Sequence, residues 1–425
     1  MRSLFLLGLF PVLCWGQLST SGYYQNWNAI RSAADYDLML FRNRFRSDVG
    51  YDHDRYSATV SLDVRLDRQR GESELEASMR EAYIDLFFEK GDLRIGKQQV
   101  VWGKADGIFI NDIVNPLDMR QFLMQDFDNI RMAQPMVKGS FYLGEWTLVG
   151  LLNPEFQPGR FAEEGNNWEF KIGLPDSIMT PMPRLNTSLP NYIHKNEEVL
   201  PEASLENAEI GLRLSTFLMG ADISLLFLDG YNDIPAYRLD RVVPTLHGFV
   251  PVQLDTYMTP FYYRSTMTGL NFSRPIFSTV LKGEMGYFTD RHFGDLEAEE
   301  FFSVSDYFQG MLGIDLSGPW DSAVSFQGVH RRILDYRESM MEDEIQMMAT
   351  AMVNGAFANE TIGLLALCIY DVSNKAGMFR FDLDYRGIDA LSISIGTYQI
   401  WGNEDSLFGQ FNTNDNLFLK VKYSY

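Results

Sequence analysis

Charged side chains recur at every second position in several segments, a spacing that places them on one face of an extended strand. Arg42, Arg44 and Arg46 form the clearest run of cations. A row of guanidinium groups along a polar surface could guide anionic or zwitterionic solutes through a charged pore. The residues that share this alternation, and that we predict to line such a pore, are Arg42, Arg44, Arg46, Asp63, Arg65, Asp67, Asp85, Arg94, Arg380, Asp382, Asp384, Arg386, Lys420 and Lys422.

Carboxylates are interleaved with these cations, which supports a second interpretation of the same residues. Asp63 and Asp67 flank Arg65, and acids also separate Arg380 from Arg386. Arg–Asp pairs across neighbouring strands would brace a water-filled interior instead of attracting solutes. The interleaved acids favour bracing, and both interpretations can hold within one wall.

Hydrolytic and metal chemistry find little support in the sequence. The five histidines show neither the spacing of metal ligands nor that of a nucleophile and its base. Ser325 and His330 lie near each other in the chain, but no pattern selects them. We therefore predict a protein that is not an enzyme and that has no catalytic residue, no metal ion and no cofactor.

The elements that must position the charged residues are strands with a side-chain period of two. Residues 59–67 show the pattern well, because valine and leucine alternate with charged and hydroxyl side chains. Such segments predict an all-β fold of about eighteen strands, with sixteen as the alternative count. The predicted strands lie near 21–31, 37–51, 56–69, 79–89, 92–100, 129–143, 145–153, 206–217, 220–231, 258–273, 276–289, 303–316, 321–332, 345–357, 360–371, 377–386, 388–401 and 414–425.

The connections between these strands differ in length in a regular way. Those after even-numbered strands are mostly short turns, whereas those after odd-numbered strands include all the long ones. Short turns at one rim and long loops at the other are typical of an antiparallel transmembrane β-barrel with periplasmic turns and extracellular loops. A secreted sandwich would also show alternation but would not need this regularity. The long connections are 101–128, 154–205, 232–257, 290–302, 333–344 and 402–413.

Both ends of the chain agree with this layout. Residues 1–16 combine Arg2 with a short apolar stretch and small residues before Gln17, which predicts a cleaved signal peptide. Residues 417–425 alternate apolar and polar side chains and end in an aromatic residue. We expect this strand to pair with the first one and close the barrel, and to be recognised by the barrel-assembly machinery.

Composition narrows the class further. With 36 basic and 57 acidic residues, the formal net charge is −21, which argues against binding to nucleic acid. No stretch reaches the roughly 18 consecutive apolar residues of a membrane helix. After removal of the signal peptide, Cys368 is the one remaining cysteine, so no internal disulfide can form. Residues 17–425 are predicted to form a single domain.

One long connection has the least barrel-like sequence. Within 93–122, the pattern R-x-G-K-Q-x-V-x-W-G is followed by an Asp-Gly pair and by V-N-P-x-D. This segment resembles Gram-negative outer-membrane porin-like barrels, either alginate-export-like or uncharacterised. The resemblance implies an outer-membrane barrel with solute passage but carries no substrate. Folded inward, the segment would narrow the pore, and its candidate constriction residues are Trp102, Asn115 and Asp118, for which packing of the loop is favoured over contact with a ligand. The proline-containing loop 154–205 is the best candidate for a plug or lid.

These features together predict a porin-like channel in the cell outer membrane, reached through the cleaved signal peptide. It would pass small hydrophilic solutes, which can include anionic ones. The alternative is a plugged barrel that acts as a surface binding or interaction protein or as a transporter of hydrophobic ligands. The expected partners are outer-membrane lipid, lipopolysaccharide and the barrel-assembly machinery, with the solute unknown.

Overall fold

The computed structural model describes residues 16–32, 36–69, 72–171, 177–179, 188–248, 250–319 and 322–425. The predicted signal peptide, 1–16, lies outside the described residues except for Gly16, so its prediction is not tested. No helix within the described ranges is long and apolar enough to cross a membrane.

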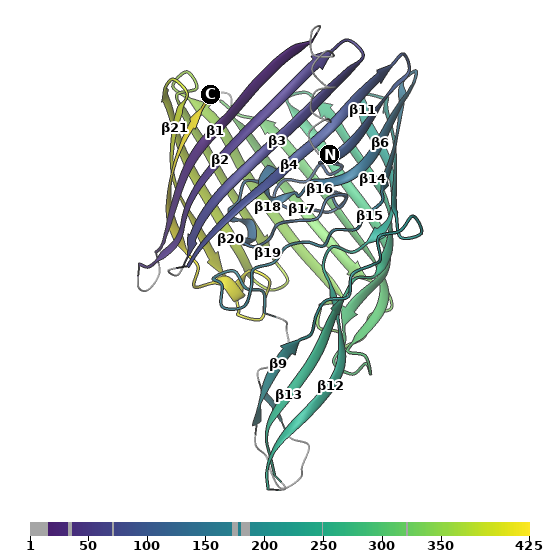
Figure 1. Cartoon of the computed structure of the whole chain (residues 1–425), viewed down its shortest axis with the longest axis vertical. Coiled ribbons are helices and arrows are strands. Elements are labelled where there is room, and N and C mark those ends of the chain that lie inside the picture. Colours follow the sequence, from purple (N-terminus) through teal and green to yellow (C-terminus); the bar gives the residue numbers. More distant parts are fainter. Residues whose placement is uncertain are drawn as a thin grey trace, which may run out of the picture.

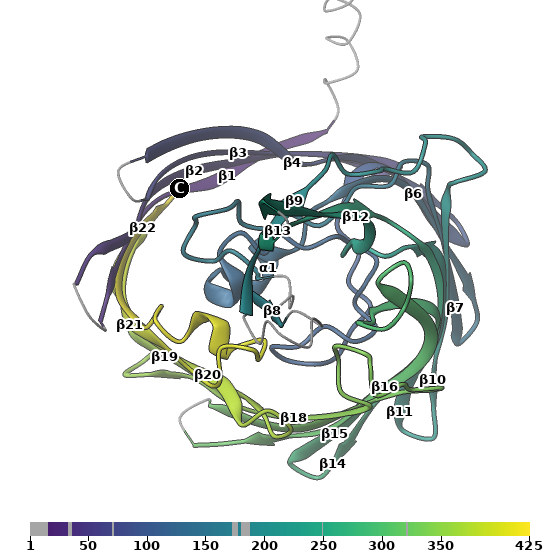
Figure 2. The ribbon, with the colours of Figure 1, turned by 90° about the horizontal axis from the view of Figure 1, so that it is seen from below.

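Eighteen antiparallel strands among the described residues form one closed barrel (Figure 1, Figure 2). Each corresponds to one of the eighteen predicted strands, so that prediction is confirmed and the alternative of sixteen is wrong. The wall strands are β1 (Gln17–Arg31), β2 (Leu38–His53), β3 (Tyr56–Gln69), β4 (Glu72–Phe88), β5 (Gly91–Gln98), β6 (Gln134–Leu143), β7 (Trp146–Asn153), β10 (Glu209–Leu218), β11 (Ala221–Tyr231), β14 (Arg264–Ile276), β15 (Thr279–Gly294), β16 (Phe302–Ser317), β17 (Ala323–Ile333), β18 (Ile345–Phe357), β19 (Ile362–Asp371), β20 (Ala376–Ile388), β21 (Leu391–Trp401) and β22 (Asn416–Ser424).

The barrel closes where β22 pairs with β1, as the sequence predicted. The register runs antiparallel from Asn416 opposite Arg31 to Ser424 opposite Tyr23. This pairing removes the two free strand edges that an open sheet would leave, so the backbone groups there are satisfied within the wall.

Strand β3 illustrates how the wall separates two environments. Its even-numbered residues from Val60 to Leu66 are apolar and 39–47% exposed. Its odd-numbered residues from Ser61 to Asp67 are polar and 3–7% exposed. An apolar outer face and a polar inner face are the arrangement expected of a strand that crosses lipid.

Strand β19 departs from this rule because both of its faces are apolar. Its inward residues Leu367 and Ile369 are 2% and 1% exposed and belong to an apolar cluster inside the barrel. Phe122 is central to that cluster, with its ring centroid 4.8 Å from that of Phe411. The core of the molecule therefore lies within the barrel, and the apolar run at residues 362–370, the longest one after the predicted signal peptide, packs against it.

The interior is filled by long connections, all of which follow odd-numbered wall strands, as predicted. Residues 99–133, called the inner segment below, carry η2 (Phe122–Met124) and α1 (Phe127–Ile130). Seen along the barrel, α1 lies within the ring of strands (Figure 2). Another short helix, η3 (Gly409–Phe411), contributes Phe411 to the interior cluster.

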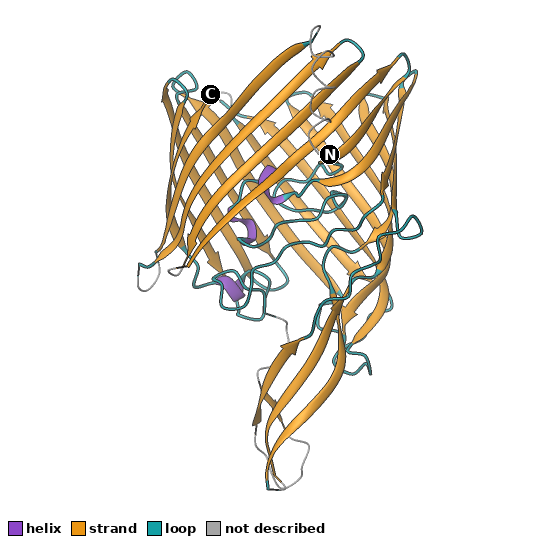
Figure 3. Cartoon of the chain, viewed as in Figure 1, coloured by secondary structure: helices purple, strands orange, loops and turns teal. Residues whose placement is uncertain are grey.

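A second sheet extends beyond the rim that carries the long loops (Figure 1, Figure 3). It contains β8 (Ser177–Met179), β9 (Ser188–Lys195), β12 (Ala236–His247) and β13 (Val250–Phe261). The prediction that 232–257, and this part of 154–205, are plain loops is therefore wrong. Register shifts interrupt the β12–β13 ladder in two places, so the period of two that marks a strand is broken there.

Candidate functional site

The inner segment is fixed to the barrel wall by a buried carboxylate on β15. Glu284 is 0% exposed, and its carboxylate accepts hydrogen bonds from the backbone N–H groups of Lys104, Ala105 (2.6 Å) and Asn111 (3.2 Å). An irregular segment inside a barrel must find partners for its backbone donors, because unsatisfied buried groups are costly. One inward side chain therefore holds three of these donors.

Asp106 makes a second attachment a few residues away. Its carboxylate lies 2.5 Å from Lys282 Nζ, and it accepts hydrogen bonds from Ser325 Oγ (3.0 Å) and Gln327 Nε2 (2.9 Å). The backbone N–H of Asp106 donates back to Gln327 Oε1 at 3.1 Å. Wall strands β15 and β17 thus hold the same short stretch of the inner segment.

Two of the predicted constriction residues stabilise the shape of this segment. Trp102 is 2% exposed in an apolar cluster against the wall, and its carbonyl accepts a hydrogen bond from Asn271 Nδ2 at 2.5 Å. The Asn115 side chain accepts from Val100 N–H at 2.6 Å and donates to the Met132 carbonyl at 2.9 Å. Their geometry is that of packing residues, and contact with a solute stays a prediction.

Residues 117–119, which precede a turn at Arg120, are extended and divide the lumen. Leu117 forms a bridge with Arg131 on one side, and Asp118 forms one with Arg160 on the other. Because side chains alternate along extended backbone, neighbouring residues face opposite ways. Leu117 and Met119 line an apolar cavity, whereas Asp118 and Arg120 line polar ones. The inner segment therefore separates two compartments of different chemistry.

The first compartment, called the basic cavity, lies between the inner segment and β2–β5 and has a volume of about 360 Å³. Eight basic side chains and three carboxylates line it. The basic residues are Arg44, Arg46, Arg65, Arg80, Lys97, Arg120, Arg131 and Arg160, and the acidic ones are Asp63, Glu76 and Asp118.

Ion pairs connect many of these charges. Asp63 binds Arg44 and Arg46, each with a 2.8 Å contact. Glu76 lies 2.6–3.0 Å from Arg65, Arg120 and Arg160. Each acid is therefore shared by more than one cation, so cationic charge remains in excess.

Two cations of the basic cavity have no carboxylate partner in the part of the chain that the structure describes. Arg80 donates to Asn129 Oδ1 (2.9 Å) and to the Asp128 carbonyl (2.8 Å), both uncharged acceptors. Lys97 lines the same cavity and makes no ion pair with a described residue. These two side chains carry charge that the brace of Arg–Asp pairs does not neutralise.

Asp118 stays ionised beside them. Burial would raise the pKa of its carboxyl, but hydrogen bonds from Arg120 and the positive charges of Arg120 and Arg65 outweigh that effect and lower the pKa below its usual value. The closest contact, Arg120 Nη2 to Asp118 Oδ2, is 2.6 Å. A second polar cavity of about 640 Å³ shares Arg65, Asp118 and Arg120 with the basic cavity, so polar space continues along this wall.

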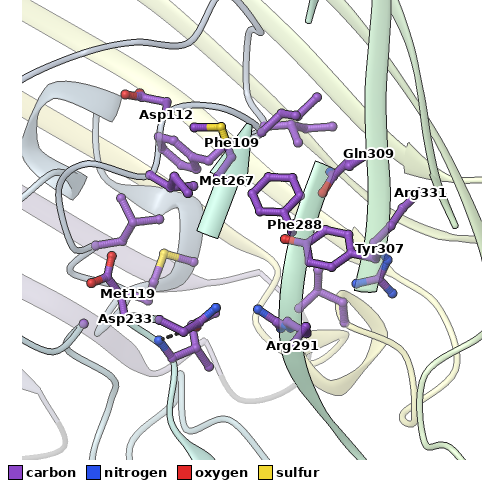
Figure 4. A pocket seen from close by; sticks show the side chains of 18 of the residues that line it. Phe109, Asp112, Met119, Asp233, Met267, Phe288, Arg291, Tyr307, Gln309 and Arg331 are labelled. Carbon is purple, nitrogen blue, oxygen red and sulfur yellow. Dashed lines mark hydrogen bonds between the residues drawn. The ribbon is translucent and has the colours of Figure 1, made fainter. Parts of the chain in front are cut away.

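The second compartment, called the apolar cavity, lies on the other face of the inner segment and has a volume of about 400 Å³. Phe109 and Met119 approach it from the inner segment, and Met267, Phe288 and Tyr307 from the wall (Figure 4). The rings of Phe288 and Tyr307 are stacked at 4.4 Å with an interplanar angle of 2°. Polar side chains, among them Arg291 and Arg331, also line this cavity.

The predicted pore-lining residues do not form one continuous ladder. Four of them, Arg44, Arg46, Asp63 and Arg65, meet in the basic cavity, and Asp67 lines the adjoining polar cavity.

Others are paired elsewhere on the wall. Arg42 is 1% exposed and paired with Asp67 at 2.6 Å. Arg94 pairs with Asp85 at 2.7 Å, away from the cavity-lining group.

The remaining candidates lie near the seam. Arg380 contacts Asp382 (2.6 Å) and Asp126 of the inner segment (2.8 Å), and Lys420 lies 3.8 Å from the same Asp126. Arg386 pairs with Asp384 at 3.2 Å, and Lys422 lies over the Tyr23 ring at 4.4 Å. Bracing pairs therefore account for most of the predicted ladder.

Sequence reasoning missed several residues that shape the site. Glu284 and Lys282 share inward parity on a correctly predicted strand, and that parity was the available signal for both. Arg80 shares the outward parity of Ile84 and turns inward only because a β-bulge at Arg80 interrupts the β3–β4 register, which the period-two pattern does not reveal. Asp106 and Asp126 lie in an irregular segment, where no periodicity indicates what a side chain faces.

Comparisons with known proteins identify a family for this chain and several solved porin structures that it resembles at low sequence identity. A family model described as "Protein of unknown function (DUF1302)" matches residues 18–371. No curated protein matches the chain. A mutant of the Rh. blastica porin is 10% identical, with 96% of this chain and 100% of that chain covered and a TM-score of 0.43. A Salmonella typhi OmpF complex with daunomycin is 8% identical, covering 96% and 98%, with a TM-score of 0.44. The predicted likeness to alginate exporters stays a prediction.

Proposed function

The chain belongs to the family described as protein of unknown function (DUF1302), and from the geometry of its lumen we propose that it is an outer-membrane channel for small hydrophilic anions. The short turns would face the periplasm, and the long loops and the second sheet would face outward. Solutes would pass along the basic cavity between the inner segment and β2–β5.

The charge balance of the basic cavity carries this proposal. Three carboxylates line the cavity, and three more (Asp67, Glu74 and Asp112) pair with its arginines from outside the lining. The two cations that remain in excess attract anions into a narrow space where water screens charge poorly. Arg80 and Lys97 contribute most to that attraction, because neither is neutralised by a carboxylate among the described residues.

Reversal potentials in planar lipid bilayers under a salt gradient test the proposal. The double variant Arg80→Gln/Lys97→Gln should lose most of the anion preference while it keeps a closed barrel. The matched control Lys195→Gln/Arg238→Gln removes two exposed cations of the second sheet and should leave the preference unchanged. Equal reversal potentials in wild type and the first variant would contradict the proposal.

The alternative is a plugged barrel that binds a ligand without steady conductance, and a specific observation favours it. The inner segment is attached at Glu284 and at Asp106 through hydrogen bonds from both backbone and side chains. A segment held in this way could keep the lumen closed until it is released. A folded wild-type protein without conductance would favour this alternative.

We also propose partners for the barrel from its exposed outer face and from its last strand. The exposed apolar residues of the outer face would contact lipid and lipopolysaccharide, and β22 would present residues 417–425 to the barrel-assembly machinery. Replacing the outward Leu419 and Tyr423 by serine should reduce assembled barrel in outer-membrane fractions. Serine at the exposed Leu205 and Leu246, outside the barrel wall, is the control.

A further inference from the structure

The apolar cavity has a cationic edge that the proposed channel does not use. Arg291 on β15 and Arg331 on β17 both line it, on either side of Tyr307 (Figure 4). The guanidinium carbon of Arg291 lies 5.9 Å from the Tyr307 ring centroid. Arg331 lies opposite Gln309 in the β16–β17 ladder. Two cations therefore meet an otherwise apolar, aromatic surface.

Both arginines have hydrogen-bonding capacity that the protein leaves unused. The Nε atoms of Arg291 and Arg331 are buried and have no hydrogen-bond partner. Glu342 pairs with Arg331 at 2.6 Å and its charge also acts on Arg291, which hydrogen-bonds with Tyr263 but makes no ion pair with a described residue. A buried donor without an acceptor is unfavourable, and a bound anion would satisfy it. The cationic edge of the apolar cavity therefore has two Nε donors without an acceptor.

The acidic groups that face this cavity do not cancel its cationic edge. Asp112 is already paired with Arg131 at 2.5 Å. Asp233 lies at the other end of the cavity (Figure 4), where burial and the charge of Glu209 raise the pKa of its carboxyl well above the usual value. A carboxyl that resists ionisation opposes an incoming anion less than a carboxylate would.

We propose that the apolar cavity binds an amphipathic monoanion, an alkyl or aryl carboxylate. Its carboxylate would pair with Arg291 and Arg331, and its tail would lie against Phe288 and the apolar face of the inner segment at Leu117 and Met119. A volume of about 400 Å³ lies within the range of small-molecule sites, which are apolar spaces with a few orienting polar groups. This site lies across the inner segment from the basic cavity and goes beyond the proposed channel.

Calorimetric titration of octanoate into the full chain in phosphatidylcholine nanodiscs tests the proposal, with empty nanodiscs as the blank. Octanoate should bind saturably with one site per chain, and octylammonium should not bind there. Arg291→Gln, which breaks no ion pair, should weaken octanoate binding by about tenfold or more, the loss expected for one charged hydrogen bond. Arg332→Gln, which removes an exposed arginine near the rim, should change nothing.

A second variant tests the cavity independently of its charge. Met119→Trp fills the space from the inner segment and should abolish octanoate binding while the barrel keeps its heat-dependent shift in gel mobility. Octanoate binding that is absent in the wild type, equal for octylammonium, or unchanged in both variants would overturn the proposal. Arg80→Gln/Lys97→Gln should alter reversal potentials but not octanoate binding, so the two proposals fail separately.

Discussion

Glu284 shows how one inward residue can determine the position of a distant segment. Its carboxyl oxygens accept hydrogen bonds from three backbone N–H groups of the inner segment. Leaving a buried N–H without its acceptor costs about 1–3 kcal/mol. A neutral amide offers a single oxygen and adds two donors that face the same N–H groups.

Glu284→Gln should therefore loosen residues 104–111. We expect amide hydrogen exchange in that stretch to rise by about tenfold or more, since the lost stabilisation exceeds roughly 1.4 kcal/mol. Exchange mass spectrometry on reconstituted protein measures this directly. Glu297→Gln, at an exposed loop position, should leave exchange in 104–111 unaltered. Unchanged protection in both variants would show that Glu284 is dispensable for attachment.

Asp118 gives a pH prediction at the same scale. Its pKa is lowered, so the carboxylate is charged, and its pairing with Arg120 is present, above the ordinary value of about 3.9. That contribution is lost only as the pH falls through the lower pKa of the folded protein. Asp118→Asn removes a negative charge from the basic cavity and should raise anion preference.

The difference between wild type and Asp118→Asn should accordingly persist from pH 7 down to about pH 4. Reversal potentials measured across that range provide the check. A difference that disappears near pH 5 would mean that the pKa of Asp118 is not lowered.

At the scale of elements, we expect the inner segment to limit passage through the lumen. It is held at Asp106 and Glu284, and both attachments depend on a carboxylate. Removing both charges leaves Lys282 with Asp315 as its remaining close partner, at 2.8 Å. The segment should then move within the lumen instead of staying against β15 and β17.

Asp106→Asn/Glu284→Gln should increase single-channel conductance several-fold relative to the wild type. Planar-bilayer recording measures the change. Glu297→Gln/Glu299→Gln removes the same charge from an exposed loop and serves as the matched control. Identical conductance in the three proteins would mean that the attachment does not limit passage.

Much of the wall, but little of the interior, could be predicted from the sequence. A strand between lipid and a polar lumen must alternate, so Val60 to Asp67 revealed both its structure and its orientation. The β12–β13 ladder was missed because β12 is exposed on both faces over much of its length and the ladder is interrupted at Leu239 and Thr245. Outside lipid, nothing imposes a strict period of two.

The inner segment was singled out from its unusual sequence as a connection that could fold inward, and it does lie inside the barrel (Figure 2), but its contacts were not predicted. Lys104 meets Glu284 across 180 residues, and such a contact leaves no local pattern. Of the candidate constriction residues, Asp118 faces polar space whereas Trp102 packs against the wall. Whether such a side chain faces the lumen or the wall depends on the path of an irregular backbone, which the sequence pattern does not reveal.

At the scale of the whole molecule, the exposed apolar residues on the outer face of the barrel predict that a lipid bilayer surrounds it. Leu62 lies near the middle of β3 and is 47% exposed. In a bilayer, lysine at the midplane costs about 2–4 kcal/mol, whereas an exposed substitution in water changes stability by less than about 0.5 kcal/mol.

Leu62→Lys should therefore destabilise the barrel by about 2–4 kcal/mol in urea unfolding from lipid vesicles. Leu246→Lys, at a 55% exposed position on the second sheet, should be nearly neutral. Equal effects of the two substitutions would contradict a membrane location for the wall.

The alternation at residues 117–120 also bears on how such a protein can diverge. Leu117 and Met119 belong to one compartment, and Asp118 and Arg120 to the other. A single-codon change at one position thus alters the preference of one compartment while its neighbour preserves the other. If both proposals hold, the anion preference of the basic cavity and the ligand preference of the apolar cavity can be selected separately, although four consecutive residues contribute to both.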